Sequence, residues 1–187
     1  MKQNIITAVR LTVACAVIFV GLYSAVVLAA AKLAPGKGKG QTITVNGRKY
    51  YTNIGQKFTE DKYFWSRPSA VDYDAAGSAG SNKGPTNPDY LNTVKARVDT
   101  FLAHNPGVKA SEIPSDLVTA SGSGLDPDIS VPAAEIQVSR IAKVRNLPAD
   151  KVADLVKSNI EKPFLGLFGT ERINVLKLNI ALNQLSK

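Results

Sequence analysis

The sequence has very little of the chemistry that builds disulfides and metal sites, with one cysteine and one histidine among 187 residues. Cys15 lies within a long apolar stretch, so the rest of the chain forms no disulfide and offers no thiol chemistry. His104 has no second histidine and no nearby cysteine, which excludes the usual kind of zinc site. We expect His104 at the C-terminal end of a helix, where the helix dipole favours a cation.

Charged residues are absent between Arg10 and Lys32, which leaves an apolar run of 21 residues, 11–31. A helix of this length spans roughly 31 Å, close to the thickness of the hydrocarbon core of a bilayer. A cleaved signal peptide is the alternative, because Ala29–Ala31 would suit its cleavage site. The run exceeds the ~7–15 apolar residues of such signals. We therefore predict that residues 11–31 form a retained transmembrane helix.

Small residues recur at every fourth position of this predicted helix, at Gly21, Ala25 and Ala29. The spacing places them on one face, where small side chains let a second membrane helix approach closely. Glycine and alanine are also common in membrane helices in general. The pattern is therefore compatible with a packing face and equally with ordinary composition.

The orientation of the helix does not follow from the charges beside it. Lys2 and Arg10 precede the apolar run, and lysines follow it at positions 32, 37 and 39. The positive-inside rule counts such residues near the ends of a span. Here the count leaves the topology open, with a slight preference for a cytoplasmic C-terminal side.

Motifs of common catalytic sites are absent from the sequence. A P-loop needs Gly-Lys followed by Ser or Thr, but Gly36-Lys37 and Gly38-Lys39 are each followed by glycine. No G-x-S-x-G elbow occurs. Residues 72–83 and 126–137 resemble the start of an EF-hand loop, but their twelfth residues are lysine and glutamine instead of glutamate. We identify no catalytic residue and no metal site.

The predicted organisation is a short tail at 1–10, the helix, a Gly/Lys linker at 32–41 and one soluble domain at 42–187. Residues 33–187 carry 20 basic and 15 acidic residues, spread along the chain. The one helix pair spaced like a helix-turn-helix has aspartates among its basic residues. We therefore expect no nucleic-acid partner.

Turn residues and helix caps predict an α+β fold for the domain, with a small sheet and about four helices. Asn46-Gly47 suits a type I′ turn and predicts a β-hairpin of Thr42–Val45 and Arg48–Thr52. Residues 75–88 are rich in Gly, Ser, Asn and Pro, which indicates a long loop, either ordered or mobile.

N-cap residues and apolar periodicity predict the helices. The first follows Asn87-Pro88 and ends near Asn105, with Leu91 on its apolar stripe. The others are expected at 130–145, at 148–160 and from Asn174 to the C-terminal region.

An aromatic run, Tyr63-Phe64-Trp65, allows two interpretations. On a strand it would contribute to the core, and on a loop its three rings would form a docking patch. We favour core packing.

Five blocks carry a specific pattern and follow one another along nearly the whole chain. They are residues 63–70, residues 80–88, residues 116–130, the group Ala133, Ala134, Gln137 and Arg140, and residues 173–182. Together they resemble the C subunit of the bacterial high-affinity potassium-transporting P-type ATPase, the Kdp complex.

The resemblance implies a bacterial inner-membrane protein with one span, a cytoplasmic N-terminus and an extracytoplasmic domain. It implies three partners: a channel-like potassium-translocating subunit, a P-type ATP-hydrolysing subunit and a small single-span subunit. Since the phosphorylated Asp-Lys-Thr-Gly motif is absent here, the chain is expected to be a non-hydrolytic accessory subunit. ATP, Mg²⁺ and potassium would belong to the partners, with ATP contact possible and no cofactor bound directly.

The family is described as a catalytic chaperone that raises the ATP affinity of the hydrolysing subunit, in addition to its role in assembly. The alternative is a structural scaffold that covers the potassium entrance without nucleotide contact. The candidates for nucleotide contact are Ser121, Ser123, Gln137 and Arg140. The candidates for partner docking are Tyr63, Phe64, Trp65, Arg67, Asn82, Asp126 and Asp128.

Overall fold

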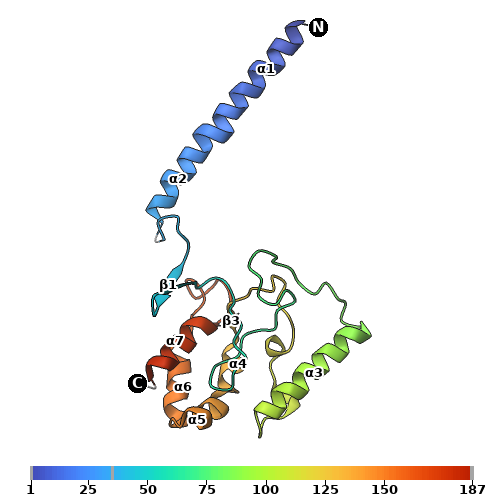
Figure 1. The fold of residues 1–187 in the computed structure, drawn as a ribbon, viewed down its shortest axis with the longest axis vertical. Helices are drawn as coiled ribbons and strands as arrows, with labels where there is room; N and C mark the ends of the chain where they lie inside the picture. The colour runs from blue at the N-terminus through green and yellow to red at the C-terminus, as the bar shows by residue number, and fades with distance from the viewer. Residues whose placement is uncertain (1, 35, 186–187) are drawn as a thin grey trace. The chain divides into compact units, whose positions relative to one another are not determined.

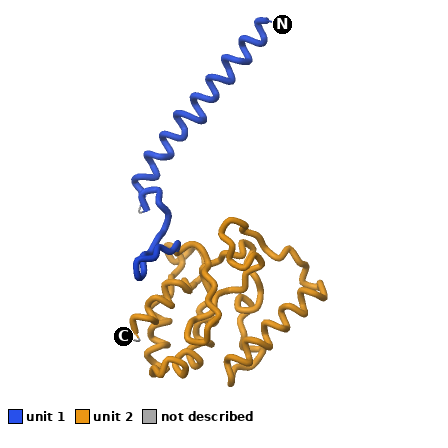
Figure 2. The backbone as a smooth tube through the Cα atoms, viewed as in Figure 1, with its two compact units in different colours: residues 1–51 blue, residues 52–187 orange. Residues whose placement is uncertain are grey.

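The chain divides into two compact units, residues 1–51 (unit 1) and residues 52–187 (unit 2) (Figure 2). The computed structural model describes residues 2–34 and 36–185. Unit 1 contains a long helix and a hairpin, whereas unit 2 contains several helices joined by irregular segments (Figure 1). The predicted α+β class is confirmed.

Unit 1 begins with a long apolar helix. It consists of α1 (Lys2–Ala16), a π-helical stretch η1 (Val17–Leu22) and α2 (Tyr23–Leu33). The 32 residues are long and apolar enough to cross a membrane, and none of the apolar window is buried within the chain. The helix predicted at 11–31 is present and continues beyond both ends of the apolar run.

The predicted hairpin is also present, as β1 (Thr42–Val45) paired antiparallel with β2 (Arg48–Tyr51). Asn46 and Gly47 have φ angles of 49° and 77°, the two left-handed positions of a type I′ turn. Strand β2 ends one residue earlier than expected.

Unit 2 contains a helical group and one separate helix. Helix α6 contacts α4, α5 and α7, while α3 lies apart with irregular segments between (Figure 1). Short 3₁₀ turns, η2 and η3, follow α3. The bounds are α3 (Pro88–His104), η2 (Ala110–Glu112), η3 (Ser115–Leu117), α4 (Val131–Glu135), α5 (Val138–Arg145), α6 (Ala149–Ser158) and α7 (Val175–Leu185).

The predicted helix caps are confirmed by their hydrogen bonds. The side chain of Asn87 accepts from the N–H of Tyr90 at the start of α3, and Ser130 accepts from Ala133 at the start of α4. Asn174 caps α7 in the same way, through the N–H three residues further on. Each cap satisfies a backbone donor that the first helical turn leaves free.

The single helix predicted at 130–145 is wrong, because the chain forms α4 and α5 with a break at Gln137. The Gln137 side-chain Nε2 donates to the carbonyl of Ala133, 2.8 Å away, which is the usual acceptor for the Gln137 N–H. The Gln137 N–H donates to the carbonyl of Ala134 instead. The side chain thus replaces one backbone hydrogen bond of the helix.

The apolar stripe predicted for α3 is only partly correct. Phe101 is buried, but Leu91 is 51% exposed. The N-terminal half of α3 lies at the edge of the unit (Figure 1), where less of the chain covers it. Helical periodicity identified the face of the helix but not how far along the helix the packing extends.

A second small sheet was not predicted. Strand β3 (Asp128–Ile129) pairs antiparallel with β4 (Ile173–Asn174) and joins the loop before α4 to the start of α7. Two-residue strands are too short to show an alternating pattern. Next to them, Glu161 and Arg172 form a backbone bridge in both directions.

The core of unit 2 is formed by apolar side chains from all five helices, from β3 and β4, and from one irregular segment. Its fully buried large members are Phe64, Phe101, Ile129, Ile141, Ile173, Leu178, Leu182, Val152 and Val156. Phe64 comes from the irregular residues 61–67, which we call the aromatic segment. The core therefore includes a segment that has no regular backbone hydrogen bonding.

Side-chain amides hold the aromatic segment in place. Asn179 on α7 accepts from the N–H of Phe64 at 2.9 Å and donates to its carbonyl at 3.0 Å. This is the pair of bonds that a neighbouring strand would provide. The N–H of Trp65 donates to Gln137 Oε1 at 2.8 Å. Buried backbone groups of the segment are thereby satisfied without a sheet.

Arg140 completes this arrangement from α5. Its guanidinium donates to the carbonyls of Asp61 and Tyr63, to Gln137 Oε1 at 2.7 Å and to Asn105 Oδ1 at 2.9 Å. Burial lowers the pKa of Arg140 to about 10. This value is still well above 7, so the guanidinium is charged at neutral pH. We call Gln137, Arg140 and Asn179 the polar clamp.

Replacing Asn179 with alanine should reduce the free energy of unfolding by about 2–3 kcal/mol, because the N–H and carbonyl of Phe64 would be buried without partners. Asn183→Ala on the same helix is the control, since Asn183 makes an exposed bond to Arg145, and its loss should cost under about 1 kcal/mol. Urea unfolding of the full chain in detergent, followed by Trp65 fluorescence, measures both. Equal costs would refute the role of the clamp.

Glu161→Gln should destabilise unit 2 at neutral pH and less at acidic pH. The hydrogen bond from Lys177, 2.6 Å away, holds the pKa of Glu161 below its usual value. A lowered folded-state pKa gives stability that is present above the unfolded pKa of about 4.3 and lost as the pH falls through the folded pKa. The difference in urea midpoint between wild type and variant should therefore shrink between pH 6 and pH 3. A difference that is independent of pH would contradict this.

Candidate functional site

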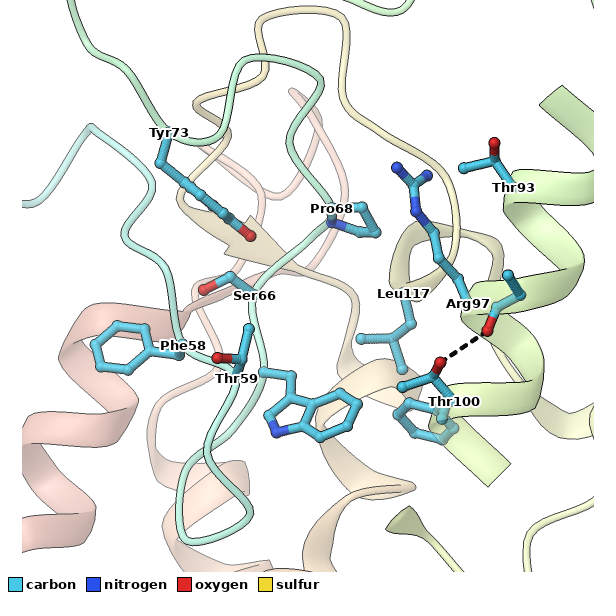
Figure 3. Close-up of a pocket in the computed structure, with 12 residues that line it drawn as sticks. Phe58, Thr59, Ser66, Pro68, Tyr73, Thr93, Arg97, Thr100 and Leu117 are labelled. Carbon is cyan, nitrogen blue, oxygen red and sulfur yellow. Dashed lines mark hydrogen bonds between the residues drawn. The ribbon is translucent and has the colours of Figure 1, made fainter. Parts of the chain in front are cut away.

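A groove of about 450 Å³ lies between α3 and the chain from Phe58 to Tyr73 (Figure 3). Trp65, Phe101 and Leu117 give it apolar walls. Thr93, Arg97 and Thr100 line it from α3, and Phe58, Thr59, Ser66, Pro68 and Tyr73 line it from the irregular chain opposite. The groove is mostly apolar with polar groups on its rim, as is usual for a binding site.

The polar groups of the groove are held by neighbouring backbone. Arg97 Nη1 donates to the carbonyl of Val118 at 3.0 Å, and the Tyr73 hydroxyl donates to the carbonyl of Arg67 at 2.6 Å. Burial raises the pKa of Tyr73 to about 12, so the phenol stays neutral. The groove thus offers one cation, Arg97, beside apolar walls. It can bind an apolar or aromatic side chain with a carbonyl or carboxylate nearby.

Of the predicted docking residues, the aromatic run is divided between the core and the surface. Phe64 is fully buried, which confirms core packing for this residue. Trp65 is half-buried, with the Arg140 guanidinium 4.8 Å from its ring centroid and Phe101 edge-on at 5.9 Å. Tyr63 packs edge-on against Phe58 at 5.5 Å. Only Trp65 of the three lines the groove.

His104 lies in the last turn of α3, as expected from the sequence. Its Nδ1 lies 2.8 Å from Asp61 Oδ1, and its ring packs edge-on against Trp65 at 5.1 Å between centroids. These contacts account for the histidine without a ligand.

The other predicted docking residues are not among those that line the groove, and their docking role stays a prediction. Arg67 pairs with Asp126 at 2.8 Å, and Arg172 pairs with Asp128 at 2.9 Å, across a charged cleft. Burial raises the pKa of Asp128. Asn82 is exposed in the long loop. In the part of the chain that the structure describes, no cluster of His, Cys, Asp or Glu is suited to hold a metal ion.

The predicted nucleotide-contact residues fall into two pairs, and their role stays a prediction. Gln137 and Arg140 belong to the polar clamp, where Gln137 is fully buried. Ser121 and Ser123 lie in a glycine-rich turn, with their hydroxyls 3.5 Å apart. Among the described residues, no hydrogen bond joins one pair to the other.

The glycine-rich turn has a clear packing role. Gly124 has a φ of 67°, and a Cβ there would lie 2.7 Å from the carbonyl of Ala79. Ser69 Oγ donates to the Gly124 carbonyl at 2.6 Å, and Ser78 Oγ donates to Ser123 at 3.0 Å. The turn therefore fixes the first part of the long loop, and its glycines allow the close approach.

The α3 side of the groove was missed by the sequence analysis. Arg97 borders the apolar stripe of the helix, three residues after Val94 and four before Phe101, but nothing in the sequence around it distinguishes it from other surface cations. The small-residue face of the membrane helix is exposed, with nothing within 4 Å of a Cβ placed at Gly21. Its pairing with another helix stays a prediction.

Comparison with known proteins identifies the family. The family model described as K+-transporting ATPase, c chain (KdpC) matches residues 5–184. Proteins named Potassium-transporting ATPase KdpC subunit from Flavobacterium psychrophilum and Flavobacterium johnsoniae are 53% and 54% identical over 184 residues, 98% of this chain and 99% of each relative. A KdpC subunit from Caldanaerobacter subterraneus is 48% identical over 97% of this chain and 95% of its own length.

These matches cover the long apolar helix and the residues of unit 2 alike. The resemblance read from five sequence blocks is therefore confirmed, and the chain belongs to the KdpC family, the c chains of K+-transporting ATPases.

Proposed function

We propose that the chain is a non-hydrolytic accessory subunit that stabilises a potassium-transporting ATPase by docking unit 2 on a membrane subunit. The family and the single long apolar helix support membership of a membrane transport complex. The partners are a channel-like potassium-translocating subunit, a P-type ATP-hydrolysing subunit and a small single-span subunit. The N-terminus is cytoplasmic and unit 2 extracytoplasmic, in the bacterial inner membrane.

One observation carries this proposal, namely that unit 2 has an open groove with apolar walls and an arginine beside them. Trp65 presents ring surface beside Arg97, with the buried Phe101 behind it. Aromatic and arginine side chains around a pocket are what protein interfaces use for their strongest contacts. We infer that the groove receives an apolar side chain from an extracytoplasmic loop of the translocating subunit, near the potassium entrance.

The long apolar helix provides the second attachment in this proposal. Gly21, Ala25 and Ala29 would meet a helix of a partner subunit, since their small side chains allow close backbone contact. Two attachments on one chain raise the effective concentration of each, so moderate contacts suffice for a stable assembly.

The alternative, a catalytic chaperone in direct contact with ATP, is less well supported by the geometry. Gln137 and Arg140 would have to give up bonds that hold the aromatic segment. Ser123 Oγ already accepts from the N–H of Leu125 at 3.1 Å. An effect on ATP affinity is then expected to pass through the partner subunits.

Calorimetry with the full chain in detergent separates these two proposals. We expect no saturable heat of ATP binding up to millimolar nucleotide, with or without Mg²⁺, because all three nitrogens of the Arg140 guanidinium already donate to acceptors within the protein. Saturable binding that Ser123→Ala abolishes would support the chaperone proposal instead. Arg140 variants are unsuitable here, since they would disturb the fold.

Ala96→Trp tests the groove directly, since Ala96 is exposed and lines the groove from α3. The indole would fill the space, so the affinity for the partner subunits should fall at least about tenfold, or ~1.4 kcal/mol. Asn92→Trp, exposed on the same helix but outside the groove lining, is the matched control. The measurement is the amount of each partner that co-purifies with the tagged chain after dilution.

Equal co-purification by the two tryptophan variants would contradict docking at the groove. An unchanged circular dichroism spectrum and urea midpoint for Ala96→Trp would show that any loss is not caused by unfolding.

A further inference from the structure

An exposed apolar loop links the α6 side of unit 2 to β4. Its residues 163–169 read Pro-Phe-Leu-Gly-Leu-Phe-Gly and include no polar or charged side chain. Its large side chains are among the most exposed of unit 2: Phe164 71%, Leu165 74%, Leu167 80% and Phe168 65%. Other exposed large apolar side chains in the described part of this unit, Leu91, Val144 and Leu185, are far apart in sequence. A contiguous apolar group of this kind marks an interaction site.

Four backbone hydrogen bonds are made within the loop. Phe164 and Phe168 exchange both N–H···O=C bonds at 3.0 Å, and Gly166 and Leu167 donate to Pro163 and Phe164 at 3.0 and 3.2 Å. Backbone groups that are paired within a segment can leave water without the cost of unsatisfied donors. Pro163 has no N–H to satisfy.

The turn at the tip keeps a leucine where folding alone disfavours it. Leu165 and Gly166 have φ angles of 54° and 72°, the two positive positions of a type I′ turn. Asparagine, aspartate or glycine suits the first of these positions, whereas leucine is strained there. Leu165 gains little burial in return. A contact outside the chain would account for a leucine at this position.

One lysine at the base of the loop favours an anionic surface. Of the nearby cations, Lys157, Arg172 and Lys177 form ion pairs with Asp154, Asp128 and Glu161, whereas no ion pair of Lys162 is found among the described residues. Lys162 directly precedes the loop. Apolar and aromatic tips with lysine or arginine behind them are the composition of segments that enter the bilayer interface.

We propose that the loop 163–169 inserts into the interfacial layer of an anionic lipid bilayer. The chain's own apolar helix supplies the tether, which keeps the loop at high effective concentration near a membrane surface. Protein interfaces usually include side-chain hydrogen bonds, and no side chain of the loop can form one. The inference does not depend on the groove or on any partner subunit.

A spin label tests this in the full chain, reconstituted alone into nanodiscs of phosphatidylcholine and phosphatidylglycerol. Leu167→Cys in a Cys15→Ala background places the label at the most exposed apolar position of the loop. Asn92→Cys on α3 is the matched control at another exposed position. Collision rates with oxygen and with a water-soluble nickel chelate report the depth of each label.

We expect the label at 167 to lie about 5–10 Å below the headgroup boundary, with higher oxygen and lower nickel access, and the label at 92 to lie in water. Pure phosphatidylcholine should reduce the insertion, and adding Phe164→Ser and Phe168→Ser should return the label at 167 to water. Aqueous values at both positions, or oxygen access at both, would overturn the proposal. So would a label at 167 that is aqueous in nanodiscs and shielded from both reagents only after the partner subunits are added.

Discussion

The fold of unit 2 depends on side chains that make the hydrogen bonds a neighbouring β-strand would otherwise make. The aromatic segment runs through the core without a neighbouring strand, and Asn179, Gln137 and Arg140 supply the donors and acceptors that its buried backbone needs. Buried polar networks of this kind are stable only when every member is satisfied. Gln137 illustrates the cost, because its side chain takes an acceptor from the helix and divides α4 from α5. Phe64 is thereby fixed in the core.

Fixing the aromatic segment also forms the groove. With Phe64 held inward, the next residue, Trp65, is placed between the Arg140 guanidinium and Phe101, where it forms one wall facing α3. The opposite wall is a helix whose outer half is little covered. A rigid wall made by a polar clamp and a less buried helix together give a surface suited to a partner, as the proposed docking requires.

The sequence predicted those parts of the fold that depend on local rules. Asn46-Gly47, Asn87, Ser130 and Asn174 were correctly identified because turns and caps follow from one or two residues. The break at Gln137, whose side chain also bonds Trp65, and the sheet of β3 and β4 involve contacts between residues far apart in sequence. No local pattern predicted them. For the candidate site, the sequence pointed to the aromatic run but not to Arg97. Only the three-dimensional arrangement places Arg97 in the same groove as Trp65.

The bond between Phe64 and Asn179 joins residues 115 positions apart, and this separation bears on how the protein is made. Synthesis delivers the apolar helix first and α7 last. The aromatic segment cannot be satisfied until α7 has left the ribosome, so unit 2 reaches its native packing only after the whole chain is complete. By then the N-terminal helix has long been available for insertion. Unit 2 therefore completes its folding after the N-terminal helix has been made, and its unfinished core is exposed for as long as translation lasts.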